Sequence, residues 1–113
     1  MTESINEHMP EHERPIPFHN MIYVGDGMTD VPSMALTKKN GGHTIAVYPE
    51  SKEREKGICL KLLEAGRVDF IAEADYRRGS RLSRRVELLL DAIIADIACR
   101  REAFDCRAEH RGA

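Results

Sequence analysis

Residues 21–34 decide the fold, and they read Met21-Ile-Tyr-Val-Gly-Asp-Gly-Met-Thr-Asp-Val-Pro-Ser-Met34. The apolar residues 21–24 are too few for a helix and end at a glycine, so they predict a buried strand. Asp26 and Asp30 follow this strand. Pro32 suits the first turn of a helix, where its missing N–H has no helical partner. The stretch therefore predicts a strand whose carboxyl end presents two carboxylates, followed directly by a helix.

Two further strand–helix units follow along the chain. The β-branched and apolar residues favour strands, and the 3.6-residue apolar period favours helices. The first predicted helix is capped by Thr29 or Asp30 and ends at Lys38 or Lys39. A predicted strand from Thr44 to Tyr48 is followed by a helix from a Ser51 cap to Gly66. A predicted strand from Val68 to Ala72 is followed by a helix from Ser80 or Ser83 to about Arg101. Alternating strands and helices predict an α/β class with a partial Rossmann-like parallel sheet of about three strands and flanking helices.

The chain has 113 residues, which is enough for one domain or a piece of one. Residues 1–17 carry three prolines and little apolar content, and they predict an irregular or partly disordered N-terminal segment. Residues 18–104 hold the predicted α/β core. Residues 105–113 are predicted to form a frayed polar tail.

Charge and composition exclude several classes of partner. A net charge of −2 gives no electrostatic reason to expect nucleic acid or an anionic membrane. The arginines at 77–85 and 100–101 are interspersed with acids, which is typical of a solvated helix face. No apolar run approaches the roughly 20 residues of a membrane span. Three irregularly spaced cysteines form no metal or disulfide pattern, so a reducing cytoplasm is the expected location.

The two carboxylates after the first strand carry the candidate chemistry. Gly25 and Gly27 allow a sharp turn and a close approach of the backbone to a ligand. Asp26 and Asp30 can then converge on one hard cation, and Mg²⁺ suits a site with few carboxylates and phosphate oxygens. The same residues also fit ordinary turn chemistry, with a hairpin at Asp26-Gly27 and with Asp30 as a helix cap. The pattern alone leaves both interpretations open.

The block from Tyr23 to Met34 resembles the fourth conserved motif of haloacid-dehalogenase-like (HAD) phosphohydrolases, in particular the phosphoserine-phosphatase-like members. The resemblance covers roughly residues 15–98 and implies a HAD-type sheet and hydrolysis of phosphate esters. It implies that Asp26 is a direct Mg²⁺ ligand and that Asp30 binds the ion directly or through water. Gly25 and Gly27 would form the loop near the phosphate. Residues 18–104 would then be the C-terminal part of the HAD core.

The resemblance also shows what is missing. The family's nucleophile and general acid lie in a DxDx[TV] motif, and no such motif occurs in this chain. We therefore expect the isolated chain to be catalytically incomplete, with no catalytic residue of its own, although a phosphorylated small molecule would bind if the site were complemented. The neighbouring strand would be absent, so residues 21–24 would have an unpaired edge and the last helix an uncovered apolar face. The expected partners are a second copy of the chain or a separate N-terminal half.

Two alternatives belong to other classes. One is a non-catalytic α/β interaction module that retains the fold but not the chemistry. The other is a response-regulator-like receiver, which also uses strand-end aspartates with Mg²⁺. The receiver is disfavoured because no phosphoacceptor aspartate or late lysine falls at a suitable strand end.

Overall fold

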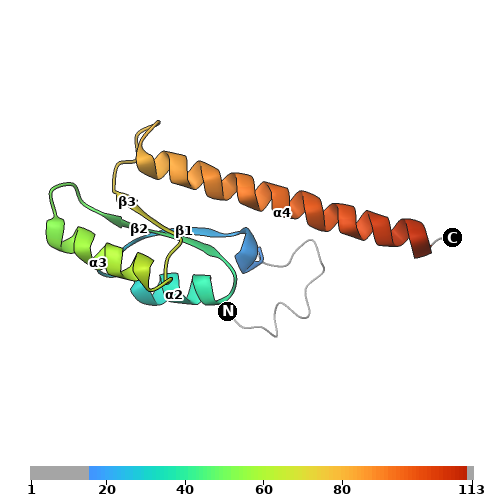
Figure 1. Ribbon diagram of the computed structural model, residues 1–113, viewed down its shortest axis with the longest axis horizontal. Helices are drawn as coiled ribbons and strands as arrows, with labels where there is room; N and C mark the ends of the chain where they lie inside the picture. Colours follow the sequence, from blue (N-terminus) through green and yellow to red (C-terminus); the bar gives the residue numbers. More distant parts are fainter. Residues whose placement is uncertain (1–15, 112–113) are drawn as a thin grey trace.

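The computed structural model describes residues 16–111 (Figure 1). Residues 1–15 of the predicted N-terminal segment 1–17 lie outside the described residues. Residues 112–113 of the predicted tail also lie outside them. The elements in chain order are η2 (Phe18–Asn20), β1 (Ile22–Asp26), α2 (Val31–Lys39), β2 (His43–Tyr48), α3 (Glu53–Glu64), β3 (Phe70–Glu73) and α4 (Arg81–Arg111).

The three strands form one parallel sheet in the order β1-β2-β3. The register pairs Tyr23 with Thr44 and Ala46 with Ile71. Each crossover passes through a helix, as parallel neighbours require. The predicted α/β class, with about three parallel strands and flanking helices, is confirmed.

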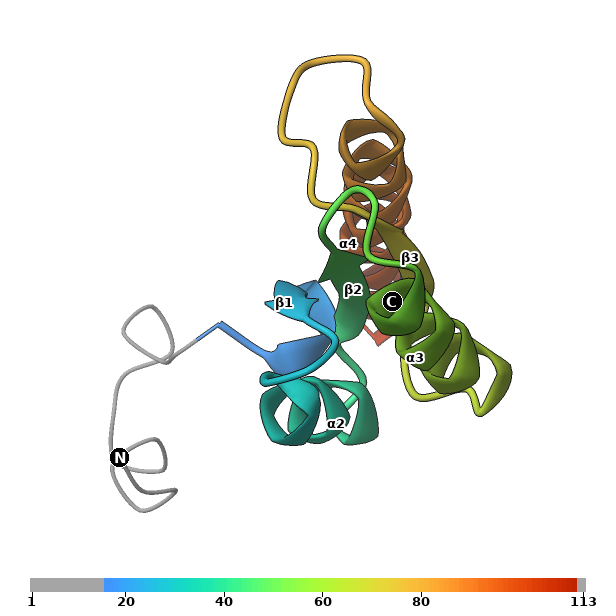
Figure 2. The ribbon, with the colours of Figure 1, turned by 90° about the vertical axis from the view of Figure 1, so that its left-hand side faces the viewer.

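The sheet lies between two helical layers (Figure 2). Helices α2 and α3 pack on one face, around Met34, Ala46 and Cys59. Helix α4 packs on the other face, where Leu82 and Leu89 contact apolar side chains of the strands. The alternation of side chains along β2 divides the core in this way, because successive residues point to opposite faces.

Helix α3 begins later than the sequence predicts. Its N-cap residue is Lys52 and not Ser51, and Lys52 makes no side-chain cap hydrogen bond. Ser51 lies in the preceding turn with φ of 66°, a left-handed conformation that side chains other than glycine rarely adopt. The prediction of a Ser51 cap was therefore wrong, because the turn after Pro49 needs this residue for its reversal.

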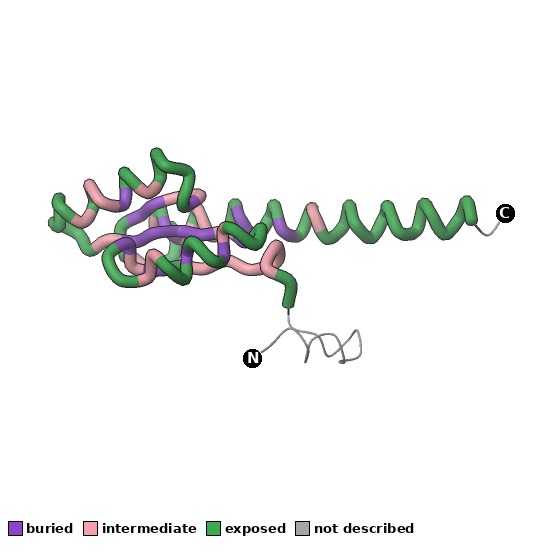
Figure 3. The backbone as a smooth tube through the Cα atoms, turned by 90° about the horizontal axis from the view of Figure 1, so that it is seen from below, coloured by how far each residue is buried: buried purple, intermediate pink, exposed green. Residues whose placement is uncertain are grey.

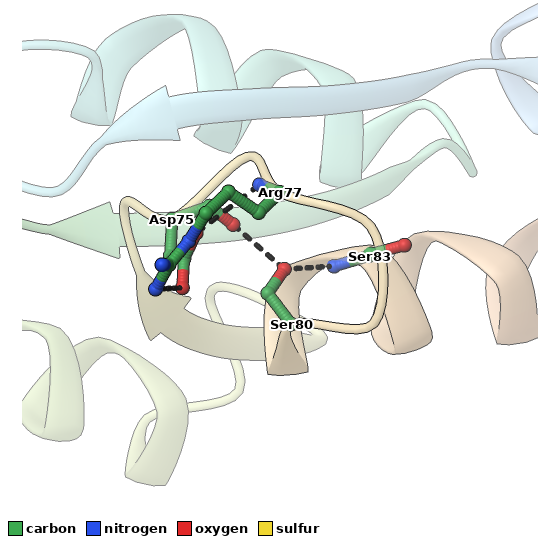
Figure 4. Close-up of polar contacts among 4 residues, drawn as sticks. All are labelled: Asp75, Arg77, Ser80 and Ser83. Carbon is green, nitrogen blue, oxygen red and sulfur yellow. Dashed lines mark hydrogen bonds and ion pairs between the residues drawn. The ribbon is translucent and has the colours of Figure 1, made fainter.

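The start of α4 follows the prediction. The Ser80 hydroxyl accepts a hydrogen bond from the Ser83 N–H at 3.1 Å and donates one to the Asp75 carbonyl at 2.7 Å (Figure 4). Arg77 bonds both carboxylate oxygens of Asp75, at 2.9 Å each, and these bonds lower the pKa of Asp75 to about 2. The loop after β3 is thereby tied to the start of α4.

The end of α4 differs from the prediction. The helix continues to Arg111, where a stop near Arg101 and a frayed tail from Asp105 were expected. Residues 102–111 contain no glycine or proline and several good helix formers, so nothing in them ends the helix. No helix within residues 16–111 is both long and apolar enough to cross a membrane.

Within the part of the chain that the structure describes, one strand edge and one apolar helix face remain uncovered, as the resemblance predicts. Among the strands of residues 16–111, β1 forms one edge of the sheet and pairs only with β2. Ile93 is the last buried residue of α4, and the remaining part of the helix extends beyond the sheet (Figure 3). Leu90, Ile94 and Ile97 are exposed along the same helix.

Candidate metal centre

Strand β1 and helix α2 place the two aspartates in one short turn. Asp26 is the last residue of β1, and Asp30 is the N-cap residue of α2. Because α2 begins immediately and β1 pairs in parallel with β2, the hairpin interpretation of Asp26-Gly27 is wrong. The aspartates lie at the carboxyl edge of the sheet, where open α/β sheets bind ligands.

Both carboxylates make local hydrogen bonds, although not the bonds expected of a helix cap. Asp30 Oδ2 accepts the N–H of Asp26 at 2.7 Å, so it reaches back to the strand and makes no side-chain cap bond to α2. Asp26 Oδ1 accepts the N–H of Met28 at 2.6 Å. Within the described part of the chain, no hydrogen bond engages Asp26 Oδ2 or Asp30 Oδ1. Each aspartate therefore keeps one oxygen for a ligand.

The glycines make this arrangement possible for steric reasons. A Cβ at Gly25 would lie 2.9 Å from Asp30 Cβ and 3.1 Å from Asp30 Oδ2, so a side chain there would displace the carboxylate from the strand. A Cβ at Gly27 would lie 2.4 Å from the Cys59 Sγ. The loop after Asp26 therefore packs directly on α3. Both glycines allow the backbone to lie close to its neighbours, where a side chain would collide.

The Cys59 side chain packs against the loop that follows Asp26. It is fully buried, and burial raises the pKa of its thiol, with further contributions from the negative charges of Asp26 and Glu55. The thiolate is the reactive form of cysteine. Cys59 therefore remains a neutral packing group beneath the candidate site, whereas Cys99 is exposed.

The donor set, two carboxylates, fits a hard cation such as Mg²⁺. Within residues 16–111, no group of three or more His, Cys, Asp or Glu side chains could hold a metal. Structural zinc needs about four such ligands. Mg²⁺ is commonly held by only one or two carboxylates, with waters and phosphate oxygens completing an octahedron. Asp26 and Asp30 supply that number.

Basic side chains that the sequence reasoning missed lie beside the turn. A hollow of about 360 Å³ is lined by Met28 and by residues 51–55, in which Lys52 and Arg54 are balanced by Glu53 and Glu55. The start of α3 lies there because loops that follow neighbouring parallel strands meet at the same sheet edge. That rule could have identified Lys52 and Arg54 from the sequence, since they closely follow the second strand.

Lys38 lies away from the turn that carries Asp26 and Asp30. It forms an ion pair with Asp69, whose other oxygen accepts the Thr44 N–H at 2.8 Å. Thr44 and Asp69 lie at the amino-terminal ends of β2 and β3, whereas Asp26 lies at the carboxyl-terminal end of β1. Lys38 therefore fastens α2 to the sheet.

A larger hollow, of about 620 Å³, runs along β3 between α3 and α4. It is lined by Lys56, Leu60, Arg81 and Arg85 among others, and includes neither Asp26 nor Asp30. Arg85 donates to the Ile71 carbonyl there. Its basic residues are offset by Glu73 and by Asp75, which is paired with Arg77. We place the candidate chemistry at the strand-end aspartates because the two carboxylates belong to one short turn and each keeps an oxygen outside the hydrogen bonds of the described residues.

Comparisons with known proteins give one relative. The chain is 37% identical over 83 residues to an uncharacterized protein of Borreliella burgdorferi. The match covers 71% of the chain but only 28% of the relative, so the chain spans less than a third of that protein's length. No family model matches the chain. No solved structure matches it significantly.

Proposed function

We propose that this chain carries the Mg²⁺-binding part of a HAD-like phosphohydrolase and that the attacking group comes from outside residues 16–111. The observation that carries the proposal is the pair of strand-end carboxylates, Asp26 and Asp30, each with one oxygen left by its local hydrogen bond. The GDGxTD sequence between β1 and α2 has the strand–turn–helix context that the family motif requires.

The residues around the turn have separate roles in this proposal. Asp26 and Asp30 hold the cation, and Mg²⁺ neutralises the charge on a transferring phosphoryl group when it is bound. The N–H groups at the start of α2 face the same turn and favour an anion. Lys52 and Arg54 line the hollow beside Met28 together with Glu53 and Glu55, so the two basic side chains could contact a phosphate ester, but the hollow carries no net positive charge.

The described aspartates provide no nucleophile at this turn. Asp69 lies at the opposite sheet edge and pairs with Lys38. Asp75 is held by Arg77. Asp91 and Asp105 are exposed on α4, and Asp96 pairs with Arg100 on the same helix. Transfer through an aspartyl-phosphate needs a carboxylate that attacks phosphorus, so the site is half of an active site.

We expect the purified chain to hydrolyse p-nitrophenyl phosphate no faster than buffer containing Mg²⁺, because the cation site alone supplies no nucleophile. A chromogenic assay at millimolar Mg²⁺ measures this. Asp26→Asn tests the proposed site, and Asp96→Asn on the exposed part of α4 is the matched control. Robust Mg²⁺-dependent hydrolysis that Asp26→Asn abolishes and Asp96→Asn preserves would overturn the incomplete-site proposal.

A non-catalytic α/β interaction module is the second candidate. The observation that favours it is that one oxygen of each aspartate already serves the local backbone. In that case the turn would be structural, and Mg²⁺ would leave it unchanged.

A further inference from the structure

The carboxyl-terminal half of α4 stands clear of the α/β core. Every residue from 97 to 111 is exposed, and this part of the helix extends past the sheet (Figure 3). The segment contains no glycine or proline. Even so, an isolated helix of roughly 12–15 residues is only marginally stable in water, because its propensity hardly offsets the cost of ordering the chain. A partner along one face would therefore stabilise this half of the helix.

Apolar side chains recur along α4 at the spacing of a coiled coil. From Leu90 onward, they follow one another at alternate intervals of four and three residues. This is the heptad pattern, in which two positions, a and d, face a partner helix. The four large apolar residues among them are all exposed, from 45% for Leu90 to 62% for Ile94. The α4 seam, as we call it, consists of Leu90, Ile94, Ile97, Arg101, Phe104 and Ala108.

The α4 seam is distinct from the face of the helix that packs on the sheet. The buried residues of α4 are Leu82, Leu89 and Ile93. At 3.6 residues per turn, the seam lies roughly a quarter turn around the helix from them. A second helix can therefore lie along the seam without displacing the sheet, and the open edge of β1 takes no part in the contact. In a two-fold pair with parallel helices, the two sheets would lie on opposite sides.

We propose that the α4 seam pairs with the seam of a second copy of the chain, as a parallel two-stranded coiled coil. The charges that flank the seam argue for this occupant. The e positions carry Asp91 and Asp105, and the g positions carry Arg100 and Arg107. All four side chains are exposed. Residues at e and g form the ion pairs that set partner choice and orientation in coiled coils.

The signs of these charges select the parallel orientation. In a parallel pair, a g residue meets the e residue of the next heptad on the other helix, so Arg100 of each copy meets Asp105 of the other. In an antiparallel pair, like positions meet, which places arginine beside arginine and aspartate beside aspartate. The seam is thus complementary to itself only when the two helices run in the same direction.

Two arginines influence the strength of the pair. Arg100 Nε donates to Asp96 Oδ2 at 2.8 Å, and no hydrogen bond within residues 16–111 engages its Nη groups. Because a guanidinium carries five N–H donors, Arg100 can keep Asp96 and also bind Asp105 of the second copy. Arg101 occupies an a position, where a polar residue fixes the register at a cost in stability. Its aliphatic stem can cover the seam while its charge reaches water. We therefore expect a dimer that dissociates on dilution.

Sedimentation velocity of the full chain, from low to high micromolar concentration in buffer without Mg²⁺, tests the pairing. We expect the mass of two chains at high concentration. On dilution, helical circular dichroism should fall, because residues 97–111 lose their partner. Ile97→Asp should weaken the dimer by about tenfold or more, since it places two like charges against an apolar seam. The control is Leu36→Asp on α2, which is similarly exposed (56% against 46% for Ile97) and should pair like the unchanged chain.

A cysteine at position 97 tests the orientation. In a chain with Cys99→Ser and Cys106→Ser, Ile97→Cys places a thiol at a d position. Like positions face each other only in a parallel pair, so we expect mild oxidation to yield a disulfide-linked dimer. In an antiparallel pair a d position faces an a position, and the link should not form.

Several results would overturn the proposal. One is a chain that stays monomeric throughout the concentration range, a readout that does not depend on any variant folding. Another is equal weakening by Ile97→Asp and Leu36→Asp, which would place the contact elsewhere. A dimer without the cysteine link would contradict the parallel orientation, and a mass of three chains would contradict the two-stranded form. Since Mg²⁺ is absent and the seam contains neither Asp26 nor Asp30, failure of the metal site would leave these outcomes unaffected.

Discussion

Replacing Gly27 with alanine is expected to lower the free energy of unfolding by about 1–3 kcal/mol, the usual cost of inserting an extra group into a packed core. The added Cβ would lie 2.4 Å from the Sγ of Cys59, which is fully buried. The loop or α3 must therefore move. Since Gly27 lies between Asp26 and Asp30, the displacement also separates the two carboxylates. Chemical denaturation followed by circular dichroism measures the loss.

A second substitution identifies the cause. With Cys59→Ala the sulfur is gone, and the nearest atoms to the new Cβ are Ala46 Cβ at 3.7 Å and Cys59 Cβ at 3.8 Å, which are ordinary contacts. We expect the double variant to be less destabilised than the sum of the two single variants. Gly57→Ala on α3 is the control, because its Cβ would meet nothing within 4 Å and alanine favours a helix. Additive losses at Gly27 and Cys59 would contradict the steric account.

Replacing Asp69 with alanine is the second change with a large expected effect, a loss of about 1–3 kcal/mol in the free energy of unfolding. Asp69 accepts the N–H of Thr44, which is fully buried, and also pairs with Lys38. Alanine leaves that buried N–H without a partner, and it releases α2 from the sheet. Thermal or denaturant unfolding measures the loss.

Two further variants separate the roles of Asp69. Asn retains an oxygen that can accept the Thr44 N–H, so Asp69→Asn should cost much less than Asp69→Ala. Lys38→Met removes only the ion pair, and Lys38 is 37% exposed, so its cost should stay below about 1 kcal/mol. If Lys38→Met lowered the free energy of unfolding as much as Asp69→Ala, the loss would come mainly from the ion pair and not from the unpaired N–H of Thr44.

Periodic local patterns predicted most of the fold. The short apolar run before Gly25, Pro32 at the start of a helix, and the β-branched residues 44–48 gave the strand–helix order correctly. The open edge of β1 followed from the missing neighbouring strand that the resemblance implies. The strand–helix order depends on residues close together in the sequence, so a single sequence was sufficient to predict it.

Features that depend on tertiary contacts escaped the sequence. The contact between Gly27 and Cys59 joins residues from different elements, as does the ion pair of Lys38 with Asp69. Asp30 lies at the predicted cap position, but its carboxylate bonds to Asp26, because the tight turn brings the strand end within reach. The helix extension to Arg111 was missed because favourable propensity without an apolar stripe was interpreted as a tail.

The central claim is that Asp26 and Asp30 together hold Mg²⁺. The most direct test is an NMR titration of the labelled chain with millimolar MgCl₂, with Asp26→Asn as the test variant and Asp96→Asn as the control. We expect saturable amide shifts confined to residues 25–30 and their neighbours, both in the unchanged chain and in Asp96→Asn. Asp26→Asn should lose these shifts. Unchanged resonances at 25–30, or the same shifts in Asp26→Asn, would contradict the metal site and favour the interaction module.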